Sequence, residues 1–227
     1  MVVDSTKMNA AKAALQFMGD GMVVGLGSGS TAAIFIGLLG ALAKRKGWTL
    51  RCIPTSEDSR ALAVKAGLPV AGLDEVSNVD VAVDGADAIS GEGYLVKGGG
   101  GCLAREKVVA YAAKKFICIA DESKLKADFP GIVPIEVLPF AHAQVARDVK
   151  RRWGVAARLR MGSGKCGPIV TDNGNYILDA GFRKIGRPDG LECELQCVPG
   201  VVANGIFARK KPVVIIGGKS GARILKV

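Results

Sequence analysis

Hydrophobic positions along the first 120 residues follow two alternating patterns. Continuous apolar runs are typical of strands that are buried on both faces, whereas apolar residues spaced three or four apart are typical of helices. Predicted strands cover 22–26, 50–53, 79–83 and 116–120, and predicted helices cover 7–18, 32–44, 56–66 and 102–114. This alternation predicts an α/β fold with a parallel sheet covered on both faces.

The pattern changes after about residue 130, where the predicted elements become shorter and mixed. Strands are predicted at 132–138, 155–160, 169–171 and 176–178 and a helix at 143–153, while 191–198 fits a short helix or a strand. Asn173-Gly174 lies between two of these strands and predicts a hairpin turn. We expect a smaller α+β unit here, and we expect the apolar run at 211–218 to rejoin the first sheet.

Composition is that of a globular protein with glycine loops. The 227 residues are 49% hydrophobic and 23% charged, which argues against disorder. Aromatic residues make up only 5% and glycines number 31, which favours an α/β enzyme over a sandwich or an RNA binder that works by stacking.

The net charge of +10 is concentrated in the second half of the chain. Residues 131–227 hold 16 basic and 7 acidic side chains, whereas residues 1–130 hold 15 and 14. The basic runs Lys150-Arg151-Arg152 and Arg209-Lys210-Lys211 contain no aromatic residues. We therefore interpret them as a solvated basic face that attracts an anionic substrate, and we expect no nucleic-acid partner.

Cysteine and histidine usage argues against a structural zinc site. The six cysteines form no CxxC pair, and His142 is the only histidine, so we predict reduced thiols, no metal and a cytoplasmic protein. The uncharged stretch 22–43 contains the loop 27–31, and its flanking apolar runs are shorter than the roughly 20 residues of a membrane-spanning helix. We therefore expect no membrane partner, and the N-terminus shows no secretory signal pattern.

The first candidate motif is the loop 25–31 between a predicted strand and a predicted helix. Its glycines let backbone N–H groups approach an oxyanion, and the helix start adds a favourable dipole. It lacks the third glycine of the dinucleotide fingerprint and the Gly-Lys-Ser/Thr of a P-loop. Ser28, Gly29, Ser30 and Thr31 suit a single phosphate group, although the same residues also suit a tight turn with hydroxyl caps.

Two further motifs follow predicted strands, at the sheet edge where parallel folds bind ligands. Asp84-Gly85-Ala86-Asp87 can accept hydrogen bonds from sugar hydroxyls or relay a proton during ring opening, although a capped turn explains it as well. Lys124 can pair with phosphate as a point charge, and its alternative is a solvated loop lysine.

The most informative segment is the glycine run that follows Lys97. Four consecutive glycines, Gly98 to Gly101, lose much conformational entropy on folding, so a ligand that needs close backbone approach explains them best. On the next helix Glu106 shares a face with apolar residues, which would raise its pKa toward that of a general base. Its flanking cations, Arg105 and Lys107, are also typical of an exposed helix glutamate.

The order and spacing of these motifs resemble the type A family of ribose-5-phosphate isomerases over essentially the whole chain. The resemblance also includes 170–175 and 199–202. It implies a Rossmann-like domain, here 1–130 plus 207–227, and a smaller inserted α+β domain at 131–206. It further implies interconversion of ribose 5-phosphate and ribulose 5-phosphate in the pentose phosphate pathway without a cofactor, by a homodimer or homotetramer.

The resemblance also implies roles for individual residues. Glu106 matches the proton acceptor of the family. The residues that match its substrate-binding positions are Ser28, Gly29, Ser30, Thr31, Asp84, Gly85, Ala86, Asp87, Lys97, Gly98, Gly99, Gly100 and Lys124. The chain departs from the family pattern at Ala88, where a glutamate is usual.

These residues fit proton transfer through an enediolate, with Glu106 as base, Lys97 at the developing oxyanion, and Asp84 or Asp87 assisting ring opening. Two other functions compete with this prediction. One is a coenzyme A transferase relative with a nucleophilic glutamate, and the other is a sugar-phosphate sensor that binds nucleic acid. The short chain and the single-phosphate loop disfavour the first, and the lack of a helix-turn-helix disfavours the second.

Overall fold

The computed structural model describes residues 4–127, 129, 131–164 and 166–225, which form two compact units. The larger unit consists of 1–86, 105–125 and 210–227, and the smaller of 87–104 and 126–209. The smaller unit therefore includes 87–104, a segment that the sequence assigned to the larger domain. The domain boundaries given above stay a prediction.

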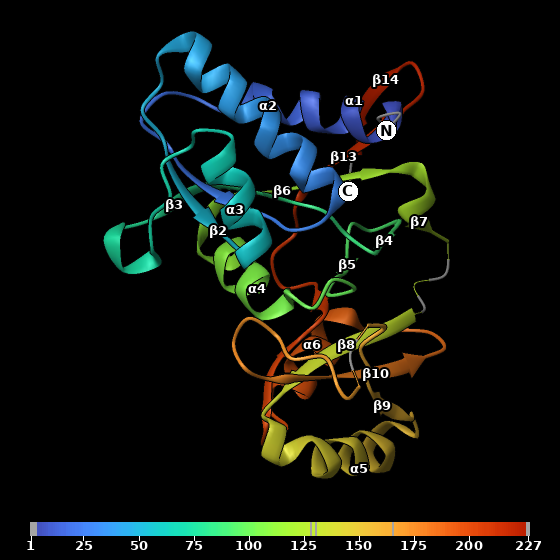
Figure 1. Ribbon diagram of the computed structural model, residues 1–227. Coiled ribbons are helices and arrows are strands. Elements are labelled where there is room, and N and C mark those ends of the chain that lie inside the picture. The colour runs from blue at the N-terminus through green and yellow to red at the C-terminus, as the bar shows by residue number, and fades with distance from the viewer. Residues whose placement is uncertain (1–3, 128, 130, 165, 226–227) are drawn as a thin grey trace. The chain divides into compact units, whose positions relative to one another are not determined.

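A six-stranded sheet forms the centre of the larger unit (Figure 1). Its order is β14-β13-β6-β3-β1-β2, formed by Gly221–Ile224, Val213–Gly218, Ala113–Asp121, Val79–Asp84, Val23–Leu26 and Arg51–Pro54. The strands are parallel except β14, which pairs antiparallel with β13 at the edge. The predicted parallel sheet and the return of 211–218 to it are confirmed.

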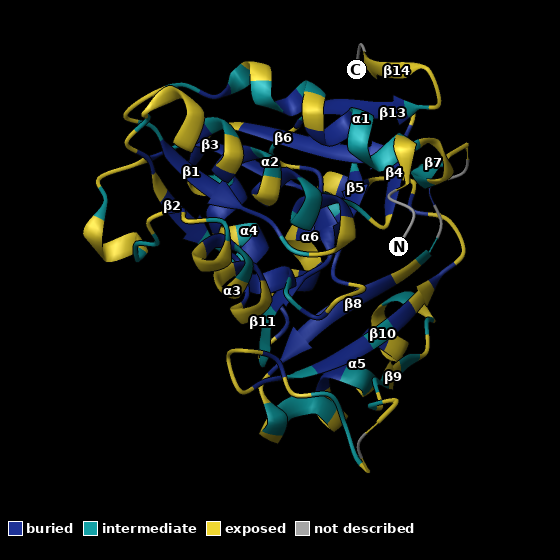
Figure 2. Ribbon diagram, turned by 45° about the horizontal axis from the view of Figure 1, so that its top comes forward, coloured by how far each residue is buried: buried dark blue, intermediate teal, exposed yellow. Residues whose placement is uncertain are grey.

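Helices cover both faces of this sheet. The helical segments of the larger unit are α1 (Ser5–Ala14), η1 (Leu15–Phe17), α2 (Ser30–Lys46), α3 (Glu57–Lys65), η2 (Leu73–Glu75), η3 (Glu122–Lys124) and most of α4 (Leu103–Ala112). On one face Phe35 and Leu39 of α2 join the core with buried residues of α1, α3 and the strands. On the other face Val109 of α4 lies against Gly25 of β1. Figure 2 shows the strands β1, β3 and β6 as buried.

At the amino ends of the strands, Asp80 connects three of them. Its carboxylate accepts hydrogen bonds from the Val23 N–H (2.9 Å) and from Lys114 Nζ (2.7 Å). The hydrogen bond from Lys114, followed by the bond from Val23, lowers the pKa of Asp80 despite partial burial. Ala113 pairs with Val79 at this end, which explains why the helix predicted to reach residue 114 ends at Ala112.

The smaller unit contains two four-stranded sheets, except that Leu125 of β7 still belongs to the larger unit. The first has the order β12-β5-β4-β7, formed by Ile206–Phe207, Leu95–Val96, Ala88–Ser90 and Leu125–Lys126. The second is antiparallel, with the order β11-β8-β10-β9, formed by Val201–Asn204, Gly131–Val137, Tyr176–Phe182 and Ala157–Leu159. The helical segments are η4 (Pro139–Ala141), α5 (His142–Trp153) and α6 (Pro188–Gln196). None of the helices that the structure describes is long and apolar enough to cross a membrane.

Two sequence predictions in this unit need correction or resolution. The segment 169–171 was predicted to be a strand, and this prediction is wrong. Its one β-bridge joins Val170 to Tyr176, and an isolated bridge does not make a strand. The expected turn at Gly174 is present, with φ of 77° and a hydrogen bond from its N–H to the Thr171 carbonyl. The segment 191–198, which fitted a helix or a strand, lies mostly in α6.

The tight contact of Gly25 predicts a stability effect. A Cβ at Gly25 would overlap Val109 Cγ1 and lie 3.0 Å from the Ala82 Cβ, so Gly25→Ala should lower the free energy of unfolding by about 1–3 kcal/mol. The control is Gly37→Ala on the exposed side of α2, where nothing lies within 4 Å, and which should stabilise by about 0.5–1 kcal/mol. Urea denaturation measures both, and equal stability of Gly25→Ala and the unmodified protein would contradict the packing described.

Candidate active site

The loop after β1 forms a tight turn that leads into α2. Gly29 has φ of 100° and immediately precedes the helix, which begins at Ser30. Among the described residues no side chain caps this helix, so the N–H groups of its first turn face the end of the loop. The partial positive charge of a helix start favours an anion at this position.

Asp84 at the end of β3 holds this loop in place. Its Oδ1 accepts hydrogen bonds from the Ser28 N–H (3.1 Å) and the Gly85 N–H (2.7 Å), and only 3% of the residue is exposed. A Cβ at Gly27 would overlap the same carboxylate, so this position requires glycine. The two predicted motifs therefore meet through hydrogen bonds at the carboxyl ends of β1 and β3.

A group of buried hydroxyls joins the end of β2 to the same loop. Ser28 Oγ lies 2.9 Å from Thr55 Oγ1 and donates to Ser56 Oγ at 2.7 Å. Ser56 also caps α3 by accepting from the Ser59 N–H. The sequence analysis did not single out Thr55 and Ser56, although two hydroxyl residues directly after an apolar strand are a signal for this sheet edge.

Two lysines lie at the carboxyl ends of the strands. Lys7 of α1 donates from Nζ to Ser30 Oγ at 3.0 Å, and Lys124 lies in η3 directly after β6. Burial raises the pKa of Asp121, but hydrogen bonds from Ser123 and the charges of Lys124 and Lys7 outweigh it and lower the pKa. Lys7 was missed because nothing in a single sequence distinguishes it from other lysines on a helix.

Glu106 lies on α4 with only 5% of the residue exposed. Its helix neighbours Val109 and Ala110 are also buried, in agreement with the apolar face expected from the sequence. The adjacent cations have partners elsewhere, because Arg105 forms an ion pair with Glu57 (3.0 Å) and Lys107 Nζ lies 5.6 Å from the centroid of the Tyr111 ring. A buried carboxylate here can act as a base toward a bound carbon acid.

The glycine loop belongs to the smaller unit and follows Lys97. Gly98 and Gly101 adopt φ values of 103° and 81°, which side-chain-bearing residues rarely adopt. Asp87 accepts a hydrogen bond from the Gly99 N–H at 2.7 Å. Lys97 is 3% exposed, donates its backbone N–H to the Gly205 carbonyl, and has its Nζ 5.7 Å from the centroid of the Phe207 ring.

Arg160, the residue that follows β9, holds this loop by hydrogen bonds from its side chain. Its Nη1 donates to the carbonyls of Gly98 (2.9 Å) and Gly99 (3.0 Å), and its other nitrogens bind the Asp179 carboxylate. The sequence analysis missed Arg160, because it lies some 60 positions away from the loop and no local motif marks it.

The structure divides the predicted site residues between the two units. The larger unit carries Ser28, Gly29, Ser30, Thr31, Asp84, Gly85, Ala86, Glu106 and Lys124, and the smaller carries Asp87, Lys97, Gly98, Gly99 and Gly100. The chain connects the two sets directly, at the 86–87 and 104–105 peptide bonds. Ala88, where the resembling family usually has glutamate, is buried in the apolar core of the smaller unit.

These features define the class as an α/β enzyme of phosphorylated substrates, because a helix start that suits an anion and a buried carboxylate both lie in the unit that is built on the parallel sheet. The family model described as "Ribose 5-phosphate isomerase A (phosphoriboisomerase A)" matches residues 51–221. The chain belongs to the ribose 5-phosphate isomerase A family.

Individual relatives match over the full length. Ribose-5-phosphate isomerase A of Pyrococcus abyssi is 46% identical, with 100% of both chains covered, and that of Methanococcus aeolicus is 46% identical over 97% of this chain and 94% of its own. The solved structure of ribose 5-phosphate isomerase A from Methanocaldococcus jannaschii has a TM-score of 0.93 at 43% identity, covering 97% of this chain and 98% of its own. A D-ribose-5-phosphate isomerase solved in complex with phospho-erythronic acid has a TM-score of 0.95 at 44% identity, covering 100% of both chains. These matches confirm the resemblance and the fold class expected from the sequence.

The contacts of Arg160 predict that it orders the glycine loop. Lysine lacks the planar guanidinium that donates to two carbonyls and a carboxylate at once. Each hydrogen bond of a charged group contributes about 1.5–3 kcal/mol to the stability of the contact. In Arg160→Lys, amide hydrogen exchange at Gly99 and Gly101 should therefore accelerate by about tenfold or more. The control is Arg158→Lys, which changes an exposed cation on β9. Equally slow exchange of the glycine amides in Arg160→Lys and in this control would contradict the proposal that Arg160 orders the glycine loop.

Proposed function

We propose that this protein interconverts D-ribose 5-phosphate and D-ribulose 5-phosphate in the pentose phosphate pathway. The observation that carries the proposal is the buried Glu106 carboxylate on α4, within the segment that matches the family model. An aldose–ketose isomerisation needs a base that moves one proton between neighbouring carbons, and a buried carboxylate suits that task.

The phosphate group is held by the loop after β1. N–H groups of the first turn of α2 and the hydroxyls of Ser28, Ser30 and Thr31 supply hydrogen bonds to its oxygens. Lys7, which donates to Ser30 Oγ, and Lys124 supply positive charge. The bonds from the Ser28 and Gly85 N–H groups to Asp84 keep the loop in its anion-binding conformation.

Glu106 moves the proton. It removes the proton from C2 of the open-chain aldose, and the electron pair passes toward O1 to give an enediolate. Return of the proton to C1, with transfer of the O2 hydroxyl proton to O1, gives the C2 carbonyl and the C1 hydroxyl of the ketose. Lys97 and the N–H groups of Gly98 to Gly100 stabilise the negative oxygen, and Asp84 or Asp87 assists ring opening.

Replacement of Glu106 by glutamine tests the role of this base. The amide keeps the size of the side chain but cannot accept the proton, so turnover of ribose 5-phosphate should fall by about 10²–10⁴-fold. A coupled assay for ketose formation measures the loss, and circular dichroism shows whether the fold is retained. The control is Glu75→Gln, which changes an exposed carboxylate of η2 and should leave turnover unchanged.

Retained turnover in a folded Glu106→Gln variant would remove Glu106 from this role. The same assay run with a chelator tests the expectation that no metal is needed, and turnover lost to the chelator would overturn it. A covalent acyl adduct on Glu106, detected by mass spectrometry with an acyl-coenzyme A, would favour the transferase alternative instead.

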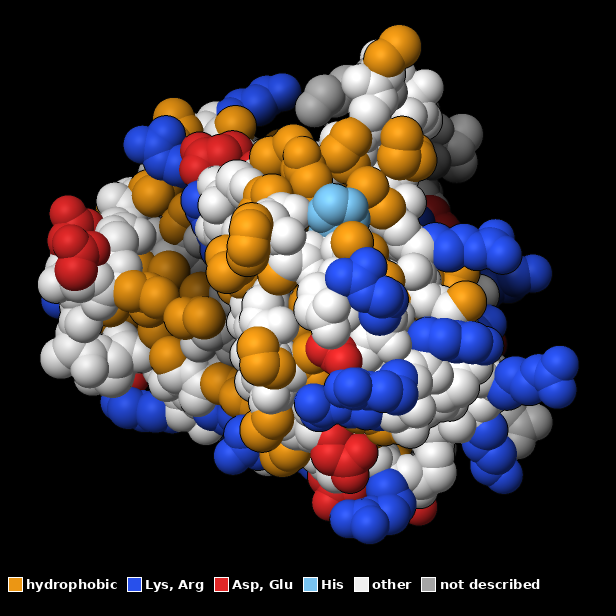
Figure 3. Space-filling model, turned by 90° about the horizontal axis from the view of Figure 1, so that it is seen from below, with side chains coloured by type: hydrophobic (Ala, Val, Ile, Leu, Met, Phe, Trp, Pro, Cys, Tyr) orange, Lys and Arg blue, Asp and Glu red, His pale blue; other side chains and the backbone are white. Residues whose placement is uncertain are grey.

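We also propose that the protein forms a homodimer or homotetramer in the cytoplasm. Phe140 is 99% exposed, and exposed Leu138 and Val170 belong to the same surface, since Val170 bridges to Tyr176 and the Tyr176 ring contacts His142. Figure 3 shows hydrophobic side chains gathered around this histidine. Such patches mark protein–protein contacts. The six free thiols fit a reducing compartment.

Light scattering tests the assembly. We expect a mass of about two or four times the 23.5 kDa of one chain, and Phe140→Asp should shift it toward one chain because it places a charge in the apolar contact. A monomeric unmodified protein would contradict the proposal.

A further inference from the structure

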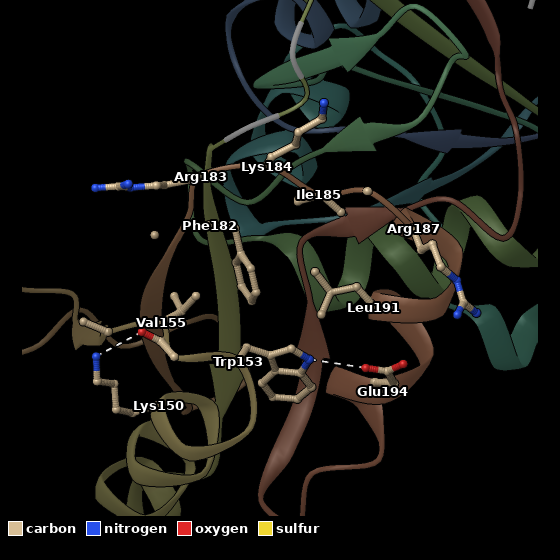
Figure 4. Close-up of a pocket in the computed structure, with 14 residues that line it drawn as sticks. Lys150, Trp153, Val155, Phe182, Arg183, Lys184, Ile185, Arg187, Leu191 and Glu194 are labelled. Carbon is tan, nitrogen blue, oxygen red and sulfur yellow. Dashed lines mark hydrogen bonds between the residues drawn. The ribbon is translucent and has the colours of Figure 1, made fainter.

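The smaller unit contains a cavity of about 770 Å³ that the proposed catalysis does not use. It is lined by residues from the end of α5, the end of β10, α6 and the segments that follow α5 and β10 (Figure 4), at positions 150, 153–156, 181–187, 191 and 194. All of these positions lie outside the predicted site segments. The volume falls within the roughly 300–1,000 Å³ that is typical of small-molecule sites.

The floor of the cavity is apolar. Phe182, Ile185 and Leu191 are buried there, and Figure 4 shows Phe182 and Leu191 pointing toward Trp153. The Trp153 side chain is half-buried, and its Nε1 donates to Glu194 at 3.3 Å, which fixes the orientation of the indole ring. Such a surface suits a flat apolar group.

The rim of the cavity is strongly basic. Among the lining residues that the structure describes, one is acidic, Glu194, and four are cationic, namely Lys150, Arg183, Lys184 and Arg187. Lys150 Nζ is held by the Gly154 carbonyl at 3.0 Å, and the guanidinium of Arg187 lies over Gly190, where a Cβ would come within 3.2 Å of Nη2. This rim accounts for part of the excess positive charge in the second half of the chain.

We propose that this cavity is a second ligand site, which binds a nucleoside phosphate. The apolar floor accepts the base, and the cations of the rim bind the phosphate groups. A single phosphate ion would not contact the apolar floor, and an uncharged ring would gain no attraction from the exposed cations of the rim. The combined site therefore selects a ligand that carries both parts.

Isothermal titration with ADP tests this proposal, in the presence of saturating ribose 5-phosphate so that the catalytic site is occupied. We expect one ADP per chain, with adenosine and inorganic phosphate each binding at least about tenfold more weakly because each lacks one of the two parts. ADP binding that ribose 5-phosphate displaces would place ADP at the catalytic site and overturn the proposal, as would no binding of ADP at millimolar concentration.

Three variants locate the site. Lys184→Gln combined with Arg187→Gln removes two exposed cations and should weaken ADP binding by about tenfold or more, whereas Arg158→Gln, a cation outside the cavity, should not. Ala156→Trp fills the cavity without changing charge and should also weaken binding. Isomerase turnover should be unchanged in all three.

Equal ADP affinity in the unmodified protein and in the Lys184/Arg187 variant would contradict the assignment. The assignment would also be contradicted if the unmodified protein bound an RNA oligonucleotide but not ADP, and if the Lys184/Arg187 variant no longer bound the RNA. That result would identify the basic rim as a nucleic-acid surface.

Discussion

The hydrogen bonds of the Asp84 carboxylate are the constraint on which the site in the larger unit depends. A parallel sheet places the ends of β1 and β3 side by side but does not determine the conformation of the loops that follow them. Asp84 does so by accepting from the Ser28 and Gly85 N–H groups with one oxygen. Bonds from N–H groups to a buried charged acceptor are stronger than neutral ones, so the loop after β1 is fixed before an anion arrives.

Hydrogen bonds from polar side chains hold the other loops of the site as well. Ser28, whose N–H binds Asp84, uses its hydroxyl to contact Thr55 and Ser56 at the end of β2. In the smaller unit Asp87 accepts from the Gly99 N–H, and Arg160 binds the two carbonyls of the same turn. In both units charged groups hold glycine-containing loops, whose backbone is intrinsically free. Rigid loops reduce the entropy lost when a substrate binds.

Much of the fold follows from the sequence because the parallel strands are continuous apolar runs. β1, β3 and β6 were predicted to within a few residues, and the order of the glycine and acidic motifs identified the family. Strands of two or three residues, such as β4, β5 and β12, are too short to produce a periodic pattern. The segment 169–171 appeared strand-like because its apolar residues precede a turn, yet Val170 makes only one bridge.

The site was predictable to the extent that its residues lie in local motifs. Asp84 and Glu106 belong to such motifs, whereas Lys7, Thr55 and Arg160 act through contacts with distant segments that one sequence does not reveal. The burial of Glu106 was expected from its helix neighbours, but the pairing of Arg105 with Glu57 joins two helices that one sequence does not place together.

The fate of the C2 hydrogen of ribose 5-phosphate tests the central claim most directly. If a carboxylate moves a proton through an enediolate, isomerisation in deuterium oxide will introduce solvent deuterium at C1 of ribulose 5-phosphate, which nuclear magnetic resonance detects. Full retention of the original hydrogen, with no deuterium at C1 after many turnovers, would indicate a hydride shift and contradict the account.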